Sequence, residues 1–277
     1  MDRSDRYDPK LSTREWGGAI SALGIRKANT KFWQLCLLGL LGGLYISFGG
    51  HLFLAVLAQG GGRVLASFMF SVGLVLVVVA GAELFTGNII MVVGLIGGRY
   101  PLLKLLRNWG AVYLGNLAGS LGYALLVWVS GLFGTTADPT DIGTVAISVA
   151  AAKVGLAFLP AVLRGVFCNI LVILAILMSI MAKDVVSKIL CCMLPVAAFV
   201  TVGFEHCVAN MFLMPIGFLA DGVPAAGWLR MVPSLVYVTL GNIVGGVFIL
   251  IIHPNRIRQL GYLWSTRRNR AAPPSLH

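Results

Sequence analysis

The sequence is poor in charged residues, which make up 11% of its 277 positions, whereas soluble domains carry about 25%. This scarcity excludes an ordinary soluble enzyme. Only ten residues are acidic against 21 Lys and Arg, so the formal net charge is +11. The basic residues lie between and beside apolar blocks instead of gathering on one polar face, which argues against nucleic-acid binding.

Residues suited to cross-links or metal binding are also few. The five cysteines are an odd number and all lie in apolar segments, so we interpret them as buried apolar side chains. The four histidines show no metal-ligand spacing, and we predict no metal site and no cofactor. The first 31 residues mix acids and bases before any apolar run, so we predict that the first apolar segment is not removed as a signal peptide.

Hydrophobic residues, by contrast, make up 58% of the chain. Crossing a membrane takes about 20 helical residues, and six blocks approach or exceed that length: residues 32–58, 64–97, 109–133, 157–181, 189–219 and 235–252. We therefore predict an all-α integral membrane protein whose six-helix domain covers residues 32–253. The connection at residues 134–153 is predicted to hold an outer loop and a short helix.

The basic residues predict the topology, because Lys and Arg bias short loops toward the cytoplasm. With the N-terminus inside, 17 of the 21 lie on the cytoplasmic side. This predicts a multi-pass protein of the cell membrane with both termini cytoplasmic. Residues 1–31 are expected to form a cytoplasmic arm, either solvated or containing a short interfacial helix with Trp16, Ile20 and Leu23 on one face. Residues 254–277 are expected to form a basic cytoplasmic tail.

Two patterns recur in the two halves of the chain. The motif G-x-E-x4-N begins at Gly81 and recurs 122 positions later at Gly203, both times inside a block too long for one straight crossing. The pattern L-G-N-x2-G begins at Leu114 and recurs 126 positions later at Leu240. Three spans per repeat orient the two halves oppositely. We predict two inverted three-helix repeats, with helices 2 and 5 broken.

A broken helix frees backbone groups that cannot face lipid, so each break is predicted to line a cavity, where half-helix N-termini favour anions. Glu83 and Glu205 are expected to bind loop N–H groups or pair with nearby donors, and so to support the shape of each break. Asn88 and Asn210 are expected to support the breaks by capping the second half-helices.

These segments resemble a known family. Residues 80–88 (AGAELFTGN) and 203–211 (GFEHCVANM) are similar to the loops in the broken helices of formate/nitrite transporters, and residues 165–172 (GVFCNILV) resemble the family's fourth-helix signature. The resemblance covers all six predicted spans. It implies transport rather than an enzymatic activity, an aquaporin-like arrangement with a pore through each protomer, and a homopentamer.

The resemblance also implies roles for individual residues. It makes His206 the polar residue at mid-membrane and Thr86 its neighbour on the other broken helix. Lys153 and Asn169 match residues associated with drawing the anion toward the pore, and Cys207 stands where serine is common. The residues that match constrictions are Leu74, Leu84 and Phe85 on the cytoplasmic side and Phe70, Val172 and Phe199 on the periplasmic side.

An anion that enters an apolar constriction loses hydration, at a cost of order 10 kcal/mol. Protonating a carboxylate with a pKa of about 4 costs only about 4 kcal/mol at pH 7, so we predict passage as the neutral acid. His206 is expected to donate or relay the proton, or to act as a neutral hydrogen-bonding group. The predicted function is a channel or proton-coupled transporter for small monovalent anions. Its predicted partners are formate first, nitrite or hydrosulfide next, together with protons and membrane lipid.

Two other classes of protein remain open. A neutral-solute pore of the aquaporin type is one, although both breaks lack Asn-Pro-Ala. The other is an intramembrane enzyme that pairs Ser120 with His206, although Ser120 lies in a glycine motif typical of helix packing. His51 and His253 are expected to lie near the membrane interface.

Overall fold

The computed structural model describes residues 13–252. The predicted tail, His253 and the first twelve residues of the predicted arm lie outside this range. The helical elements in chain order are α1 (Thr13–Asn29), α2 (Phe32–Ala58), α3 (Gly62–Phe70), α4 (Val72–Val75), η2 (Leu76–Gly81), α5 (Phe85–Asn88), η3 (Ile89–Met91), α6 (Val92–Ile96), α7 (Leu102–Val129), α8 (Asp141–Val154), α9 (Phe158–Met181), α10 (Val185–Val202), α11 (Cys207–Ala220), η4 (Ala225–Arg230) and α12 (Met231–Ile252).

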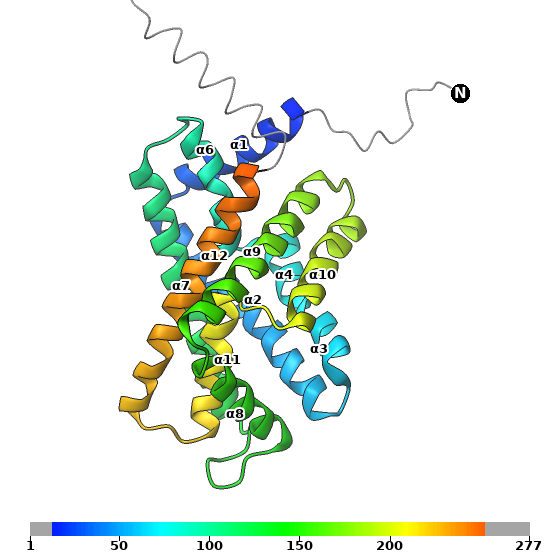
Figure 1. Cartoon of the computed structure of the whole chain (residues 1–277), viewed down its shortest axis with the longest axis vertical. Helices are drawn as coiled ribbons and strands as arrows, with labels where there is room; N and C mark the ends of the chain where they lie inside the picture. Colours follow the sequence, from blue (N-terminus) through cyan, green and yellow to red (C-terminus); the bar gives the residue numbers. More distant parts are fainter. Residues whose placement is uncertain (1–12, 253–277) are drawn as a thin grey trace, which may run out of the picture.

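Six helical stretches are long and apolar enough to cross a membrane: Phe32–Ala58, Gly62–Gly81, Leu102–Val129, Phe158–Met181, Val185–Val202 and Ala225–Ile252. They confirm the prediction of an all-α protein with six membrane-capable helices. The predicted connection at residues 134–153 contains the short helix α8. Figure 1 shows α1 and α6 at one end of the molecule and α8 at the other.

Several helix boundaries differ from the prediction. Helices α7, α10 and α12 begin seven, four and four residues earlier than expected, and α7 also ends four residues earlier. Charged residues marked the predicted starts of α7 and α10, but long basic side chains such as Lys104 and Lys188 extend along a helix and keep their charge at its end. In α12, Pro233 lies in the first turn, where proline is tolerated.

The predicted helix in the arm is present as α1, and it packs on the protein. Its side chains Ile20 and Ala28 are buried, and the helix contacts η3, α6 and α7. The Arg107 Nη2 atom of α7 donates hydrogen bonds to the carbonyls of Ala28 and Thr30, at 3.0 and 2.8 Å. The helix is therefore held by contacts with the protein, which neither of the two expectations for the arm included.

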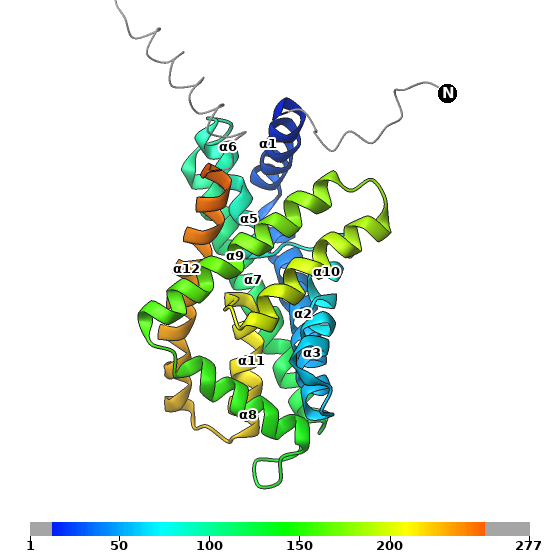
Figure 2. The same ribbon diagram turned by 45° about the vertical axis from the view of Figure 1, so that its right-hand side comes forward.

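Two pairs of long helices pack very closely, α2 with α7 and α9 with α12. Glycines lie at both crossings. A β-carbon at Gly43 or Gly119 would collide with the backbone of the facing helix in the first pair, and Gly241 and Gly245 have the same role in the second pair. The largely buried helix α11 also contacts α7 and α8, and Figure 2 shows it in the centre of the molecule.

The second and fifth spans break at the predicted glycines. The π-helical segment η2 ends at Gly81, and α10 ends just before Gly203. Both glycines are left-handed, with φ of +85° and +84°, a conformation that costs side-chain-bearing residues energy. Three residues follow each glycine before the next helix begins at Phe85 or Cys207.

Candidate functional site

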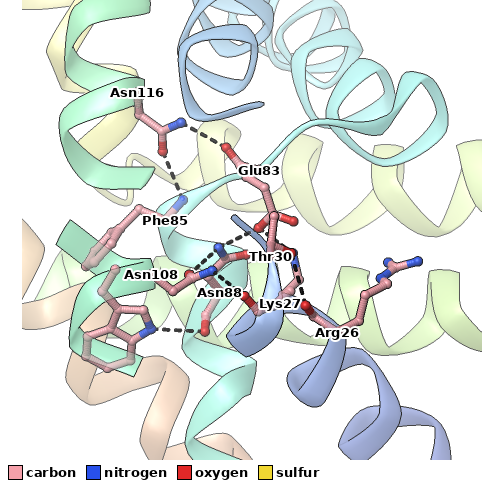
Figure 3. Close-up of polar contacts among 9 residues, drawn as sticks. Arg26, Lys27, Thr30, Glu83, Phe85, Asn88, Asn108 and Asn116 are labelled. Atoms are coloured by element: carbon pink, nitrogen blue, oxygen red, sulfur yellow. Dashed lines mark hydrogen bonds and ion pairs between the residues drawn. The ribbon is translucent and has the colours of Figure 1, made fainter. Parts of the chain in front are cut away.

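One asparagine from α7 satisfies the first break. The Asn116 Nδ2 atom donates to the carbonyls of Gly39 and Glu83, at 2.7 and 2.9 Å. Its Oδ1 atom accepts a hydrogen bond from the Phe85 N–H at 2.9 Å, as Figure 3 shows. A single buried amide thus binds one group within the break and one at the start of α5, where backbone partners are missing, and joins both to α2.

The second break is held by the matching asparagine of α12. The Asn242 Nδ2 atom donates to the carbonyls of Gly165 and Glu205, at 2.8 and 3.0 Å, and its Oδ1 accepts from the Cys207 N–H at 2.9 Å. Glu205 and Cys207 match Glu83 and Phe85 at the 122-residue offset of the break motif, and Gly165 lies 126 positions after Gly39. The recurring L-G-N-x2-G pattern therefore places a structural asparagine at each break.

The break glutamates are both paired with side-chain donors. The Glu83 Oε2 atom accepts from Lys27 Nζ and Asn88 Nδ2, each at 2.6 Å (Figure 3). Burial holds the pKa of Lys27 below its ordinary value, and the adjacent carboxylate offsets part of this effect. This pairing is one of the two arrangements predicted for the glutamates.

The second glutamate repeats this arrangement. The Glu205 Oε2 atom accepts from Lys153 Nζ and Asn210 Nδ2, each at 2.8 Å. Lys153 comes from the last turn of α8, so this short helix brings a cation to the second break. The structure therefore places Lys153, which the family resemblance named as a site residue, beside the second break.

The predicted capping role of the two asparagines is wrong. Leu84 and His206 occupy the N-cap positions, with extended backbone conformations. Asn88 and Asn210 lie inside α5 and α11, too far along each helix to cap its first turn. The cap of α11 is the imidazole of His206, whose Nδ1 atom accepts from the Ala209 N–H at 3.1 Å. Both asparagines instead support the breaks by binding the glutamates.

Sequence reasoning missed Lys27 as a site residue and assigned it only to the arm. Lys27 precedes Lys153 by 126 positions, the offset that also separates the two structural asparagines. Its neighbour Asn108 donates to the Lys27 carbonyl at 3.3 Å, and Ser234, 126 positions further on, donates to the Lys153 carbonyl at 3.1 Å. Extending the repeat into the arm would have found the pair.

Replacing Lys27 with methionine is expected to lower the free energy of unfolding by about 3 kcal/mol, because Glu83 would keep a buried charge without its cation. Adding Glu83→Gln should restore much of the loss. Thermal unfolding of the purified protein in detergent measures both effects. The exposed Lys31 gives a matched control, Lys31→Met, with little expected change. Equal stability of the Lys27 and Lys31 variants would contradict the structural role of the pair.

The two breaks meet at a buried polar pair. The Thr86 Oγ1 atom lies 2.8 Å from His206 Nε2, and both residues are buried. Because the Ala209 N–H can only donate, His206 Nδ1 accepts, and the proton of the neutral imidazole lies on Nε2. His206 therefore donates to the Thr86 hydroxyl oxygen. Its ring stacks on Phe199 with centroids 6.0 Å apart.

A cavity of about 460 Å³ reaches His206 from the end of the molecule where α8 lies. We call it the α8-side cavity. Phe70 and Phe199 line it, with ring centroids 6.2 Å apart. Its charged lining residues are Arg63, Lys153, Arg164 and Glu205.

A second cavity, of about 470 Å³, opens at the end where α1 lies, and we call it the α1-side cavity. It reaches Leu84 at the first break. Its charged lining residues are Arg26, Lys27, Glu83 and Lys188. The two cavities thus approach the two breaks from opposite ends of the molecule.

Three of the predicted constriction residues line neither cavity. Leu74, Phe85 and Val172 are buried, and the ring of Phe85 packs edge-on against Trp109 and Tyr113 of α7. The structure brings Phe70, Phe199 and Leu84 to the cavities but leaves the other three within packed regions.

Asn169 lies next to the Thr86–His206 pair. Its Nδ2 atom donates to the carbonyls of Asn242 and Thr86, at 2.7 and 3.4 Å. Its buried Oδ1 atom has no hydrogen-bond partner among the residues that the structure describes. The predicted amide thus contacts the backbone of α5 after the first break and of α12 beside the second.

The remaining candidates have other partners. Ser120 donates to the carbonyl of Gly43 at 3.2 Å, so it joins α7 to α2 and is not paired with His206. His51 is half-buried, and its Nδ1 atom lies 2.8 Å from the hydroxyl of Tyr123. Within residues 13–252, no group of three or more His, Cys, Asp or Glu side chains is placed to hold a metal ion.

Six membrane-capable helices and two broken spans that meet between charged cavities are features of a membrane channel or transporter. Comparison with known proteins identifies the group. The chain belongs to the formate/nitrite transporter family, whose family model matches residues 15–254. This confirms the resemblance inferred from the sequence and excludes the enzyme alternative.

Similar proteins include a probable formate transporter of Methanothermobacter thermautotrophicus, 38% identical over 261 residues that cover 85% of this chain and 93% of the relative. The formate channel FocA of Escherichia coli strain K12 is 33% identical over 246 residues, 80% of this chain and 86% of the relative.

Solved structures agree with the fold. A structure titled "Pentameric formate channel with formate bound" has a TM-score of 0.68 and 32% identity, and the match covers 84% of this chain and 98% of that one. An "FNT family ion channel" has a TM-score of 0.73 and 28% identity, with 91% and 99% covered.

Proposed function

We propose that the protein carries small monovalent anions across the cell membrane, with formate as the first candidate and nitrite or hydrosulfide as alternatives. The names of the relatives, formate channel and probable formate transporter, support this choice. The single observation that carries it is the buried Thr86–His206 hydrogen bond at the meeting point of the two breaks, with a cavity approaching from each end.

The cavities favour anions. Each is lined by three basic side chains and one carboxylate, and an excess of one charge in a cleft concentrates ions of the opposite sign. The packed layer between them is apolar except for groups such as Thr86 and Asn169. Crossing it as the neutral acid avoids the cost of moving a bare anion into a low-dielectric region.

The polar pair supports a hydrogen-bonding role for His206. Nε2–H donates to Thr86, so the threonine hydroxyl is free to donate its own proton to an oxygen of the permeating acid or anion. A relay through the imidazole would need Nδ1 to take up a proton, which would break its bond to the Ala209 N–H at the start of α11. Among the roles expected for His206, this geometry favours positioning Thr86.

The likeness to a pentameric formate channel supports a homopentamer with one pore per protomer. The concentration of Lys and Arg at the predicted inner segments supports cytoplasmic termini. The proposal therefore includes a homopentamer in the lipid of the cell membrane, with both termini cytoplasmic.

Anion uptake by proteoliposomes tests the function. We expect formate uptake on both sides of pH 7, faster below it, with competition by whichever of nitrite, hydrosulfide and lactate shares the pore. Control vesicles contain the Thr86→Val variant. Vesicles that take up neither formate nor nitrite at any pH would refute the proposal, and water or glycerol swelling without anion uptake would indicate the aquaporin-type alternative.

His206→Phe is expected to fold but to reduce formate flux at every pH between 5 and 8, because neutral His206 acts by holding Thr86 and not by titrating. Phenylalanine keeps the ring that stacks on Phe199, yet it provides neither the donor to Thr86 nor the cap of α11. Loss of the cap should cost about 1 kcal/mol of stability. His51→Phe is the matched control, and unchanged formate flux in the His206 variant across this pH range would contradict the positioning role.

A further inference from the structure

The walls of the α8-side cavity are mostly apolar. Aromatic and aliphatic side chains from α2, α3, α10, α11 and the second break surround the space, among them Phe53, Leu57, Phe204 and Leu213. The basic side chains that line it are Arg63, Lys153 and Arg164. A volume of about 460 Å³ lies in the range of about 300–1,000 Å³ typical of small-molecule sites.

Two of the three basic side chains have N–H donors that no described residue accepts. Lys153 is bound to Glu205, whereas the guanidinium of Arg164 has no hydrogen-bond partner in the part of the chain that the structure describes. Arg63 uses Nε to donate to the carbonyl of Val200 at 3.3 Å, which leaves its terminal nitrogens available. Guanidinium groups bind carboxylates and other oxyanions through two parallel hydrogen bonds.

Both arginines adjoin the second break. The Arg63 guanidinium lies against Gly203, and the backbone carbonyl of Arg164 accepts from the Glu205 N–H at 3.3 Å. They come from different helices, α3 and α9, and they line the same cavity. A bound oxyanion would therefore sit at the approach to His206, beyond the Lys153–Glu205 pair.

The α1-side cavity has a different lining. Its basic residues are accompanied by polar side chains, including Thr30, Asn88 and Ser179. An anion with an apolar tail has more to gain from the aromatic and aliphatic walls of the α8-side cavity, because burying apolar surface adds to the attraction of the charges.

We propose that the α8-side cavity is a binding site for amphipathic monoanions. Arg63 and Arg164 bind the oxyanion head, and a short apolar tail lies against Phe53, Leu57 and Leu213. Binding does not depend on formate transport, whereas its effect on flux rests on the proposed function. A ligand whose head stays charged cannot cross as a neutral acid, so it remains in the cavity and blocks the path.

Sodium benzenesulfonate tests the site, because its sulfonate stays ionised and its ring is apolar. Isothermal titration calorimetry on the purified full-length protein in detergent measures binding without any need for transport. We expect Arg164→Gln and Arg63→Gln each to weaken binding about fivefold to tenfold, as for the loss of a charged hydrogen bond. Arg164→Lys keeps the charge but not the paired donors, so it should give an intermediate loss.

Lys188→Gln is the matched control, since it removes one cation from the α1-side cavity. It should leave the affinity for benzenesulfonate unchanged. No heat of binding in the wild type, or equal affinities in the wild type and the three arginine variants, would overturn the site. Arg164→Gln is the more decisive variant, because the Arg164 guanidinium supports no other described residue.

Measurements of formate flux distinguish failure of this inference from failure of the proposed function. In proteoliposomes that contain the wild type, benzenesulfonate on both sides should block formate uptake, and Arg164→Gln should raise the concentration that gives half-maximal block by about fivefold to tenfold. Block that Lys188→Gln relieves and Arg164→Gln does not would place the ligand in the other cavity and contradict the inference. Wild-type vesicles without formate uptake would refute the proposed function, and calorimetry would still decide the site.

Discussion

Asn242→Leu is expected to lower the free energy of unfolding by about 3 kcal/mol or more and to abolish transport. Leucine would leave the carbonyl of Glu205 and the N–H of Cys207 buried without partners, and it would remove the bond to the carbonyl of Gly165 in α9. Each unsatisfied group costs about 1–3 kcal/mol. Thermal unfolding in detergent and formate uptake in vesicles measure the two effects.

Matched variants isolate the role of the amide. Asn242→Asp keeps an acceptor for the Cys207 N–H but turns carboxylate oxygen toward two carbonyls, so it should be nearly as damaging as leucine. Asn116→Leu should cause a similar loss at the first break, while Ser234→Ala, which removes one hydrogen bond, should cost about 1 kcal/mol. A melting temperature of Asn242→Leu close to that of the wild type would show that the break does not need this side chain.

Thr86→Val is expected to reduce formate permeability by about 100-fold, the effect of removing one well-placed donor from a polar site. Valine has nearly the same shape as threonine, so the packing at α5 is kept. The Nε2–H of His206 would lose its acceptor, and no hydroxyl would remain to meet the permeating acid. Stopped-flow measurement of formate uptake, normalised to reconstituted protein, gives the permeability.

Thr86→Ser separates the hydroxyl from the methyl group of threonine. It keeps the bond to His206, so it should retain at least about a tenth of the wild-type permeability, well above that of the valine variant. Equal permeability in the serine and valine variants would mean that the hydroxyl does not contact the permeating species, and the proposed mechanism would then be wrong.

The breaks could be predicted because their signal is local. Gly81 and Gly203 interrupt apolar segments that are too long for one crossing, and a left-handed backbone needs glycine at both positions. The repeat also marked Asn116 and Asn242 without assigning them a role. Their role depends on how α7 and α12 lie beside the breaks, which a sequence pattern does not specify.

Other parts of the site depend on contacts between distant segments. Lys27 and Glu83 are 56 positions apart and belong to different helices, so nothing in the composition of the arm indicates that this lysine is inward-facing. The family resemblance assigned Phe85 to a constriction, whereas in the structure its ring packs edge-on against Trp109 and Tyr113. The positions of the breaks along the chain could be predicted from the sequence. The partners of their side chains could be identified only from the packed structure.

The glycine contacts of α2 with α7 and of α9 with α12 have a mechanical consequence. Backbones in direct contact leave no side chains whose rotamers can absorb sliding, so each pair behaves as a stiff column. Glycine also brings α3 against α2 at Gly49 and α8 against α11 at Gly217, whereas no glycine contact of this kind involves α10 among the described residues, so α10 is the wall of the α8-side cavity expected to move. Adjustment to permeants of different size is therefore expected at α10, and substitutions on this helix should tune conductance without loosening the two glycine-packed pairs.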